Sequence, residues 1–315
     1  MKVLITGAAG FIGQLLAEVL LNEESYTVVL SDIILPPIPR GVKYPQNAKA
    51  VKTDLSEDAS TVVDASLDAA FVFHGIMSSG AEEKFDFGMK VNLDATRRLL
   101  EACRAVRPGI RVIYASSQAV YGRPFPAVVD EDVRPTPESS YGAAKLMCET
   151  LVNDYTRRKF IDGIVLRFPT ISVRPGKPTA AASSFLSGMI REPINGLESI
   201  IPLKDRSFGS WVCSPRTLVH NLMHALTLDT TLMPPHVREV NLPGIHVTIQ
   251  DMMDALEKVA GKDKLQYLTE EDDPATEAIL RSWADRFDNK YAYSLGFKPD
   301  GSFEEAVEDY WKSVV

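Results

Sequence analysis

Short apolar runs alternate with amphipathic segments through the first half of the chain. The apolar runs predict buried strands at 3–5, 27–30, 50–51, 69–73, 111–115 and 163–167. The segments between them have helical periodicity, most clearly at 15–21, 91–105 and 139–160. Strands that alternate with helices in this way are joined by right-handed crossovers, which place helices on both faces of a parallel sheet. The pattern therefore predicts an α/β fold built on a doubly wound parallel sheet.

The alternation changes after about Phe168. Residues 173–178 are rich in proline and glycine, and loops separate the helical patterns that follow at 183–190, 217–226, 249–259 and 303–311. Because open α/β sheets bind ligands at the carboxyl ends of their strands, we expect this half to form a smaller, mixed α/β domain that binds substrate over that edge. The expected domains are residues 1–170, which regain 208–240, and residues 171–315.

Charge, hydropathy and cysteine content narrow the class of protein. The chain has 34 basic and 42 acidic residues, a net charge of −8, and no basic stripe, so a nucleic-acid partner is not expected. No apolar run reaches the roughly 18 residues that a membrane-spanning helix needs, and MKVLITG is a strand-like run rather than a secretory signal. The three cysteines are odd in number and far apart in the sequence, so they form no disulfide framework and suit a reducing cytoplasm. The five histidines show no metal-binding pattern. We therefore expect a cytoplasmic protein that binds neither a membrane nor a metal.

A glycine-rich turn follows the first predicted strand and opens the first predicted helix. Its glycines are Gly7, Gly10 and Gly13, and Phe11 and Ile12 begin the helix. Gly7 permits a tight turn, Gly10 lets the backbone approach a pyrophosphate, and Gly13 lets the helix pack on the strand. Amides at the start of the helix then bind the phosphates. The turn predicts a dinucleotide cofactor, the alternative being a plain strand–turn–helix.

Acidic residues at the ends of the next two strands bear on the identity of the cofactor. Asp32 ends the second strand, where a carboxylate accepts hydrogen bonds from both ribose hydroxyls and repels a 2′-phosphate. It therefore favours NAD over NADP, unless it is only a solvent-facing strand end. Asp54 and Leu55 end the third strand, where the carboxylate either meets the adenine or belongs to a simple turn.

Tyr141 and Lys145 lie four residues apart in the pattern YGAAK, on one face of a predicted helix. A free phenol has a pKa of about 10, but a nearby ammonium and the positive nicotinamide favour the phenolate. Tyr141 then accepts the proton of a substrate hydroxyl while hydride leaves the same carbon. Ser117, at the end of the strand 111–115, hydrogen-bonds the reacting oxygen in this scheme, and Ser116 is the alternative for that role.

Several motifs together resemble the extended short-chain dehydrogenases/reductases, the group that includes nucleotide-sugar epimerases and dehydratases. They are TGAAGFIG, Asp32, VNLDATRRLLEAC, YASSQAVYG, YGAAK and the ending LGFKPDGSFEEAVEDY. The resemblance implies a Rossmann-type domain that binds NAD, and a homodimer formed through helices near 94–106 and 140–158. It also implies that Asn92 supports the active-site backbone, while Gly75 and Pro169 border the cofactor.

Features in both halves of the chain bear on the substrate. Nucleotide-sugar enzymes of this group usually have an Arg-Asp pair before an aromatic residue, whereas this chain has Gly209 and Ser210 before Trp211. The segments 74–82 and 167–178, with AASSFLSGMIREP and 214–216, instead resemble the sugar-acid dehydrogenases of the group. That resemblance implies NAD-linked oxidation of a small, four-carbon sugar acid at C2 to the 2-oxo acid.

A small carboxylate substrate needs a guanidinium fork or several other donors. Arg174, in the loop rich in proline and glycine, is the first candidate, followed by Arg191 and Arg216. The structural alternatives for these three are loop pinning, a helix-end charge and surface pairing, in that order. Ser78 and Ser79 either bind substrate hydroxyls or form a turn.

Two other functions fit parts of the same pattern. A nucleotide-sugar epimerase would keep NAD bound and return the hydride, and a non-catalytic dinucleotide sensor would regulate a partner. The Gly209-Ser210 sequence argues against the first, and the presence of both Tyr141 and Lys145 argues against the second. We therefore favour a sugar-acid dehydrogenase.

Overall fold

The computed structural model describes residues 1–177 and 181–314, which form two compact units. The first unit comprises Met1–Val120, Ser139–Arg167 and Leu222–Val240, and the second comprises Tyr121–Glu138, Phe168–Asn221 and Asn241–Val315. These units differ from the expected domain boundaries in three segments. Residues 121–138 and 168–170 group with the second unit. Only 222–240 of the expected 208–240 returns to the first.

The first unit is built on a seven-stranded sheet with the order β10-β6-β5-β4-β1-β2-β3. Its strands are β1 (Lys2–Thr6), β2 (Thr27–Asp32), β3 (Ala48–Lys52), β4 (Ala69–Val72), β5 (Ile110–Ser117), β6 (Ile161–Phe168) and β10 (Glu239–Asn241). Strands β1 to β5 pair in parallel. The order runs outward in both directions from β1 and β4, which confirms the predicted doubly wound sheet.

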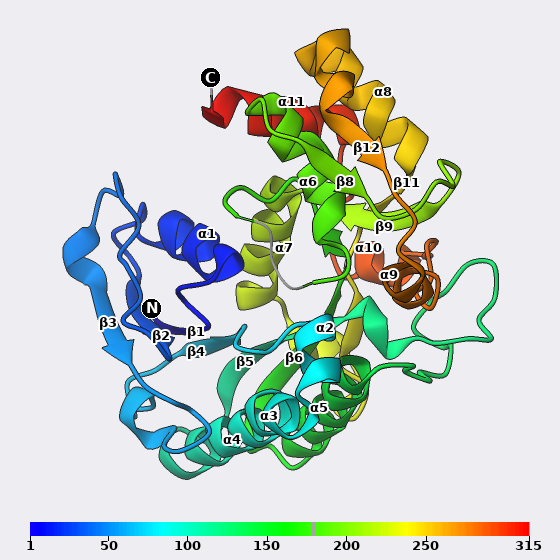
Figure 1. The fold of residues 1–315 in the computed structure, drawn as a ribbon. Coiled ribbons are helices and arrows are strands. Elements are labelled where there is room, and N and C mark those ends of the chain that lie inside the picture. The colour runs from blue at the N-terminus through cyan, green and yellow to red at the C-terminus, as the bar shows by residue number, and fades with distance from the viewer. Residues whose placement is uncertain (178–180, 315) are drawn as a thin grey trace. The chain divides into compact units, whose positions relative to one another are not determined.

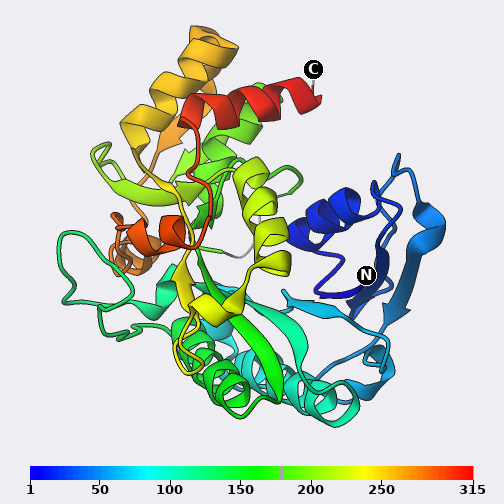
Figure 2. The ribbon, with the colours of Figure 1, turned by 180° about the vertical axis from the view of Figure 1, so that it is seen from behind.

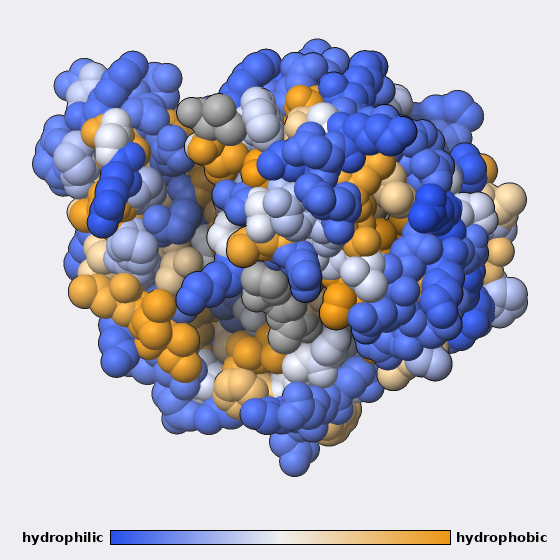
Figure 3. All heavy atoms as spheres, turned by 45° about the horizontal axis from the view of Figure 1, so that its top comes forward, coloured by the Kyte–Doolittle hydropathy of each residue, from blue (hydrophilic) through white to orange (hydrophobic). Residues whose placement is uncertain are grey.

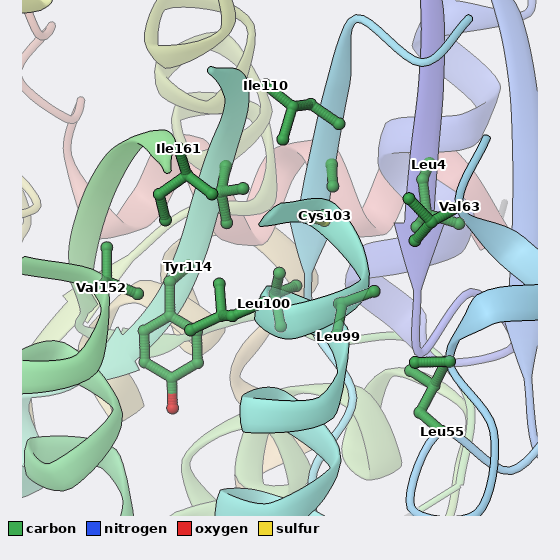
Figure 4. Close-up of a cluster of buried hydrophobic side chains, with 14 of the residues drawn as sticks. Leu4, Leu55, Val63, Leu99, Leu100, Cys103, Ile110, Tyr114, Val152 and Ile161 are labelled. Carbon is green, nitrogen blue, oxygen red and sulfur yellow. The ribbon is translucent and has the colours of Figure 1, made fainter. Parts of the chain in front are cut away.

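Helices cover both faces of this sheet (Figures 1 and 2). Helix α1 (Phe11–Leu20) lies on one face, while α4 (Ala95–Val106) and α5 (Ser140–Arg157) lie on the other. Figure 4 shows the core under α4 and α5, where Leu100 and Val152 pack beside Tyr114 of β5. All four residues of β4 are buried, as expected for a central strand covered on both faces.

The predicted helix at 91–105 contains a break in its regular geometry. After α2 (Ser78–Glu83) and α3 (Phe85–Met89), a π-helical turn spans Lys90–Asp94 and leads directly into α4. Hydrophobic periodicity does not distinguish such a turn from α-helix. π-Turns are frequent at functional sites. The buried residue Asn92 lies within this one.

The second unit contains two small sheets and several helices. One sheet has the order β11-β9-β7, and the other pairs β12 with β8. The strands are β7 (Thr170–Ile171), β8 (Ser199–Ile201), β9 (Gly209–Cys213), β11 (Ile245–Thr248) and β12 (Leu268–Glu270). The helices are α6 (Ser184–Ile194), α7 (Pro215–Thr227), which continues into the first unit, α8 (Ile249–Ala260), α9 (Pro274–Leu280), α10 (Lys290–Ser294) and α11 (Phe303–Val314). Met189, Met252 and Val307 belong to the core of this unit.

Hydrophilic residues predominate on the face drawn in Figure 3, where hydrophobic residues form separate patches. Among the described helices, none combines the length and the apolar character needed to cross a bilayer. Within the same residues, no group of His, Cys, Asp or Glu is arranged to hold a metal ion.

Candidate active site

Helix α5 presents Tyr141 and Lys145 from its first two turns. The Ser139 side chain caps the helix by accepting a hydrogen bond from the Gly142 amide at 3.1 Å. This cap fixes the start of α5, so Tyr141 lies in the first turn and Lys145 follows one turn later. The ammonium nitrogen of Lys145 is 5.5 Å from the centre of the Tyr141 ring. The structure therefore brings together the pair that the four-residue spacing predicts.

Lys145 is buried against the end of strand β5. Its Nζ donates a hydrogen bond to the carbonyl oxygen of Ala115 at 2.6 Å and lies 4.8 Å from the centre of the Tyr114 ring. Burial lowers the pKa of Lys145 to about 8, against the opposing charge interactions with Cys148 and Glu149. The lysine is therefore desolvated, and its charge is sensitive to its neighbours.

Two adjacent serines end β5, and their side chains have different surroundings. The buried hydroxyl of Ser116 donates to Glu149 Oε1 at 2.5 Å. Ser117 is only partly buried, and its hydroxyl oxygen accepts a hydrogen bond from the Ala119 amide at 3.1 Å. Successive strand residues point to opposite faces, so only one of the two can face a substrate. The Ser116 contact with Glu149 favours Ser117 for that role.

The glycine-rich turn leaves no room for side chains at Gly7 and Gly13. Gly7 has φ +65°, and a Cβ there would lie 2.8 Å from the amide nitrogen of His74. A Cβ on Gly13 would lie 2.7 Å from Ala8 Cα, so side chains at either position would fill the turn. Gly10 is exposed and precedes Phe11, the first residue of α1. The amides of Phe11 and Ile12 belong to the first turn, where helical amides have no intrahelical acceptor.

Asp32 lies beside this turn at the end of β2. Its Oδ2 accepts a hydrogen bond from the Ala9 amide at 2.9 Å, and its Oδ1 accepts one from the Ile33 amide at 2.7 Å. A carboxylate offers about four lone-pair positions, so Asp32 retains acceptor capacity for ribose hydroxyls. The turn and this carboxylate together fit the phosphates and a ribose of a dinucleotide.

The environments of Asp54 and Leu55 favour the simpler of their two interpretations. Asp54 is exposed and accepts hydrogen bonds from the Ser56 amide at 2.9 Å and from its hydroxyl at 2.6 Å. These bonds, the hydroxyl first, lower the pKa of the Asp54 carboxyl. Leu55 packs its side chain into the core (Figure 4), which leaves its backbone for any contact with a cofactor.

Asn92 fixes the loop that follows β4. Its Oδ1 accepts a hydrogen bond from the Ile76 amide at 2.7 Å, and its Nδ2 donates to the Ile76 carbonyl at 3.1 Å. A Cβ on Gly75 would lie 3.0 Å from Asn92 Oδ1, so the loop and Asn92 pack closely. This arrangement supports a positioning role for Asn92 toward the backbone at Gly75.

Helix α2 carries Ser78 and Ser79 and is attached to the start of α5. Ser78 is buried and Ser79 is partly buried. The Glu82 carboxylate accepts a hydrogen bond from the Ser140 amide, next to Tyr141. Glu82 ends the predicted segment 74–82, but its contact with Ser140 joins segments that are far apart in the sequence, so no local pattern predicts it.

Three further polar residues of the first unit have no role in the site predicted from the sequence. Glu149 and Arg167 are buried, and His74 is partly buried. His74 Nδ1 lies 2.9 Å from Thr6 Oγ1, and its Nε2 lies 3.3 Å from Thr96 Oγ1. Glu149 and Arg167 form a buried ion pair with an Nη2–Oε2 distance of 2.7 Å. Glu149 follows Lys145 by four residues, on the same face of α5, and this spacing is the one sequence signal that could have identified it.

The three candidate arginines lie in the second unit, with Arg174 and Arg191 in direct contact. The backbone of Arg174 donates to Ser187 Oγ at 3.1 Å and accepts from Arg191 Nη1 at 2.9 Å. Arg191 also pairs with Glu192 at 2.6 Å, so its guanidinium already has structural partners. Arg216 is exposed and pairs with Glu305 at 2.9 Å and Asp309 at 3.3 Å. These contacts favour structural roles for Arg191 and Arg216.

Two prolines of the predicted segment 167–178 differ in how far the structure describes them. Pro169 is buried and belongs to the second unit, between β6 and β7. Pro178, which ends the segment 167–178, lies outside the described residues.

Comparisons with known proteins extend over the whole chain. The model of the NAD dependent epimerase/dehydratase family matches residues 3–207. A D-erythronate dehydrogenase of Haemophilus influenzae is 40% identical over 98% of both chains. A second, from Cupriavidus necator, is 42% identical over 100% of this chain and 99% of its own.

Solved structures give the same picture of the fold. A nucleoside-diphosphate-sugar epimerase from Agrobacterium tumefaciens has a TM-score of 0.92 and 36% identity, covering 100% of this chain and 94% of its own. A GalE-like L-threonine dehydrogenase from Cupriavidus necator has a TM-score of 0.87 over 100% of both chains. Its identity is only 20%, so this second likeness concerns the fold alone.

Proposed function

Because the chain belongs to the NAD dependent epimerase/dehydratase family, we propose that it oxidises D-erythronate at C2 to the 2-oxo acid, with NAD as its cofactor. One observation carries this proposal: two D-erythronate dehydrogenases match the chain from end to end at 40% and 42% identity. The segments 74–82 and 167–178, which predict a small sugar acid as substrate, lie within both matches.

Three residues of the first unit perform the proposed chemistry. Tyr141 accepts the proton of the C2 hydroxyl, and Ser117 donates a hydrogen bond to the same oxygen as the carbonyl forms. Lys145 favours the phenolate of Tyr141 through its positive charge, 5.5 Å from the ring. When bound, NAD supplies the acceptor for the hydride that leaves C2. The proton and the hydride thus leave the hydroxyl oxygen and C2, which become the carbonyl group of the 2-oxo acid.

The proposed cofactor site is the carboxyl edge of the sheet in the first unit. Gly7, Gly10 and Gly13 leave room for the pyrophosphate, and the Phe11 and Ile12 amides donate to it. Asp32 accepts hydrogen bonds from the adenine ribose, which excludes the 2′-phosphate of NADP. The remaining contacts proposed within the first unit come from Asp54, Leu55, Gly75 and Asn92, together with Tyr141 and Lys145. Pro169, which the family resemblance implies, belongs to the second unit.

For the substrate, we propose Arg174 as the partner of the carboxylate. The amide of Arg174 donates to the Ser187 hydroxyl and its carbonyl accepts from Arg191, so the backbone from which the side chain extends is fixed. Ser78 and Ser79 are proposed to bind hydroxyl groups of the sugar acid. Arg191 and Arg216 are the further candidates, and their guanidinium groups pair with the carboxylates of Glu192 and Glu305.

A second candidate function is that of a nucleotide-sugar epimerase. It is supported by the Agrobacterium tumefaciens structure, described as a nucleoside-diphosphate-sugar epimerase and 36% identical over the whole chain. Gly209 and Ser210, in place of the usual Arg-Asp pair, argue against it. An epimerase would return the hydride to its substrate and leave no net NADH.

Formation of NADH distinguishes the two functions. The purified protein is incubated with NAD and with a panel of four- to six-carbon sugar acids and UDP-sugars, and NADH absorbance is followed. Rapid reduction with D-erythronate is the expected result. No reduction with any acid, together with epimerisation of a UDP-sugar, would reject the dehydrogenase and support the epimerase.

We further propose a cytoplasmic homodimer in which α4 and α5 form the interface. The three cysteines are free and buried, which suits a reducing compartment. Light scattering combined with size-exclusion chromatography measures the mass directly. A monomer of 34.7 kDa at micromolar concentration would reject the dimer.

A further inference from the structure

A buried ion pair lies one helical turn beyond Lys145. Glu149 of α5 and Arg167 of β6 expose 0% and 5% of their surfaces. Arg167 donates from Nη2 to Glu149 Oε2 at 2.7 Å and from Nε to Oε1 at 3.0 Å, and Ser116 donates to Oε1 at 2.5 Å. Both carboxylate oxygens thus accept hydrogen bonds, as expected for the ionised form.

This network and the catalytic lysine hold consecutive residues of β5. Lys145 is bonded to the carbonyl of Ala115, and Glu149 is bonded to the hydroxyl of Ser116. Ser117 follows immediately and points to the opposite face of the strand. Two side chains, four residues apart on α5, therefore fix the strand end that presents Ser117. A shift of Glu149 would change the position of Ser117 relative to Tyr141 and Lys145.

Stability alone does not explain why an ion pair occupies this position. Two buried charges lose their hydration, and well-packed apolar residues of similar volume are often as stable or more stable. An ionised carboxylate near Lys145 has a second effect, because it attracts the ammonium in a region of low dielectric constant. That attraction opposes the burial that lowers the pKa of Lys145 to about 8.

The other groups around these two residues come from several elements. Those facing Lys145 are Tyr141, Cys148 and Glu149 of α5, Tyr114 of β5, and His74, which follows β4. Those facing Glu149 are Arg167 of β6, Ser116 of β5 and Glu239 of β10. Burial raises the pKa of Glu149, while the Arg167 and Ser116 contacts act in the opposite direction.

We infer that Glu149 is a positioning residue of the catalytic centre, which fixes the end of β5 against α5 and stabilises the ammonium form of Lys145. The inference rests on the catalytic roles proposed for Ser117, Tyr141 and Lys145. It extends them by a residue that touches neither substrate nor cofactor. Arg167 is its partner, holding the carboxylate in place from the neighbouring strand.

The test compares Glu149→Gln with Glu149→Asp and with a control at the other end of the same strands. Asp162→Asn breaks the pair between Arg111 of β5 and Asp162 of β6, which are 2.7 Å apart. For each variant, kcat and KM with NAD and D-erythronate are measured against pH, together with Tm and the Kd for NADH. In Glu149→Gln we expect kcat to fall roughly 10-fold or more and the alkaline limb of kcat to move to lower pH, by on the order of one unit. The Kd for NADH should stay within about twofold, Glu149→Asp should restore part of the shift, and Asp162→Asn should leave the profile in place.

A second readout needs no substrate. The effect of Lys145→Met on the free energy of unfolding is measured against pH, in the wild type and in Glu149→Gln. Loss of the carboxylate should move the ionisation of Lys145 to lower pH in the folded state. An unchanged kcat profile and unchanged Lys145 ionisation, with a loss of Tm like that of Asp162→Asn, would overturn the inference. Tyr141→Phe is assayed in parallel, because an active Tyr141→Phe enzyme would reject the proposed mechanism and not the role of Glu149.

Discussion

Lys145 donates a hydrogen bond from its ammonium group to the main-chain carbonyl of Ala115, over 2.6 Å. The bond joins the second turn of α5 to the strand end that carries Ser117, two residues later. A carbonyl carries only a partial charge, so it compensates incompletely for the lost hydration of the ammonium. This is the physical reason why the pKa of Lys145 falls to about 8 in the folded protein.

The depressed pKa of Lys145 predicts a pH-dependent contribution to stability. Between pH 8 and 10.5 the unfolded chain keeps a proton that the folded chain has lost, so this contribution rises with pH. Lys145→Met removes it. The free energy of unfolding of the wild type minus that of the variant should therefore increase across this window, by up to about 3 kcal/mol. Urea unfolding at several pH values measures the difference, with the exposed Lys52→Met as control, and a flat difference would contradict the prediction.

Ser116 and Ser117 provide a matched pair of adjacent substitutions. Ser117→Ala should lower kcat roughly 100-fold with little change in Tm, because it removes a donor to the reacting oxygen. Ser116→Ala should lower Tm more and kcat less, because it removes a buried bond to Glu149. Steady-state kinetics and thermal unfolding measure both effects. A larger loss of kcat in Ser116→Ala would exchange the two roles.

The sequence predicts those features that depend on local spacing. The alternation of strands and helices gives the sheet, and the spacing of Gly7, Gly10 and Gly13 gives the turn before α1. The four-residue spacing of Tyr141 and Lys145 also predicts their common helical face. Each of these signals lies within one or two neighbouring elements, where periodicity and turn chemistry decide the structure.

Other features depend on contacts that no local pattern encodes. β10 has only three residues, one of them Glu239, so it lacks the apolar run of a buried strand. The bond from Ser140 to Glu82 joins α5 to α2, and the Glu149–Arg167 pair joins α5 to β6. The π-turn at 90–94 keeps the same apolar residues as a regular helix would, so its geometry leaves no mark on the hydrophobic pattern.

Asp32 should control the choice between NAD and NADP. Asp32→Ala is expected to weaken NADH binding roughly 10- to 100-fold, the usual range for charged hydrogen bonds. NADPH binding should weaken less or improve, because the repulsion of its 2′-phosphate is lost. Fluorescence titration gives both Kd values. As a control, Asp54→Ala, which alters a carboxylate bonded to Ser56, should change the Kd for NADH less. Equal losses of affinity for NADH and NADPH in Asp32→Ala would contradict the role of Asp32 in cofactor choice.

His74 should make the protein sensitive to acid. Burial, with a smaller contribution from the Lys145 charge, lowers the pKa of His74 from 6.5 to about 3. Below pH 6.5 the unfolded chain binds a proton that the folded chain does not, so stability is lost as the pH falls toward 3. The wild type should therefore lose stability relative to His74→Gln by up to about 1.4 kcal/mol per pH unit in this window. Unfolding in urea between these limits measures the slope, with the exposed His236→Gln as control, and parallel curves for wild type and His74→Gln would reject the prediction.

Arg174 and Arg216 should differ in their effect on the sugar acid. Arg174 has its backbone held by Ser187 and Arg191, whereas Arg216 is exposed and paired with Glu305. Arg174→Gln should raise KM for the acid roughly 10-fold or more and leave the Kd for NADH unchanged, because a charge-assisted bond to a carboxylate is lost.

The matched Arg216→Gln change should alter KM less than about twofold, since exposed ion pairs contribute roughly 0–1 kcal/mol. Arg191→Gln is expected between the two, with a lower Tm, because it releases the Arg174 carbonyl and leaves Glu192 without its guanidinium partner. A larger rise of KM in Arg216→Gln than in Arg174→Gln would assign the substrate carboxylate to Arg216. The ion pairs of Arg216 with Glu305 and Asp309 would then have to break when the substrate binds.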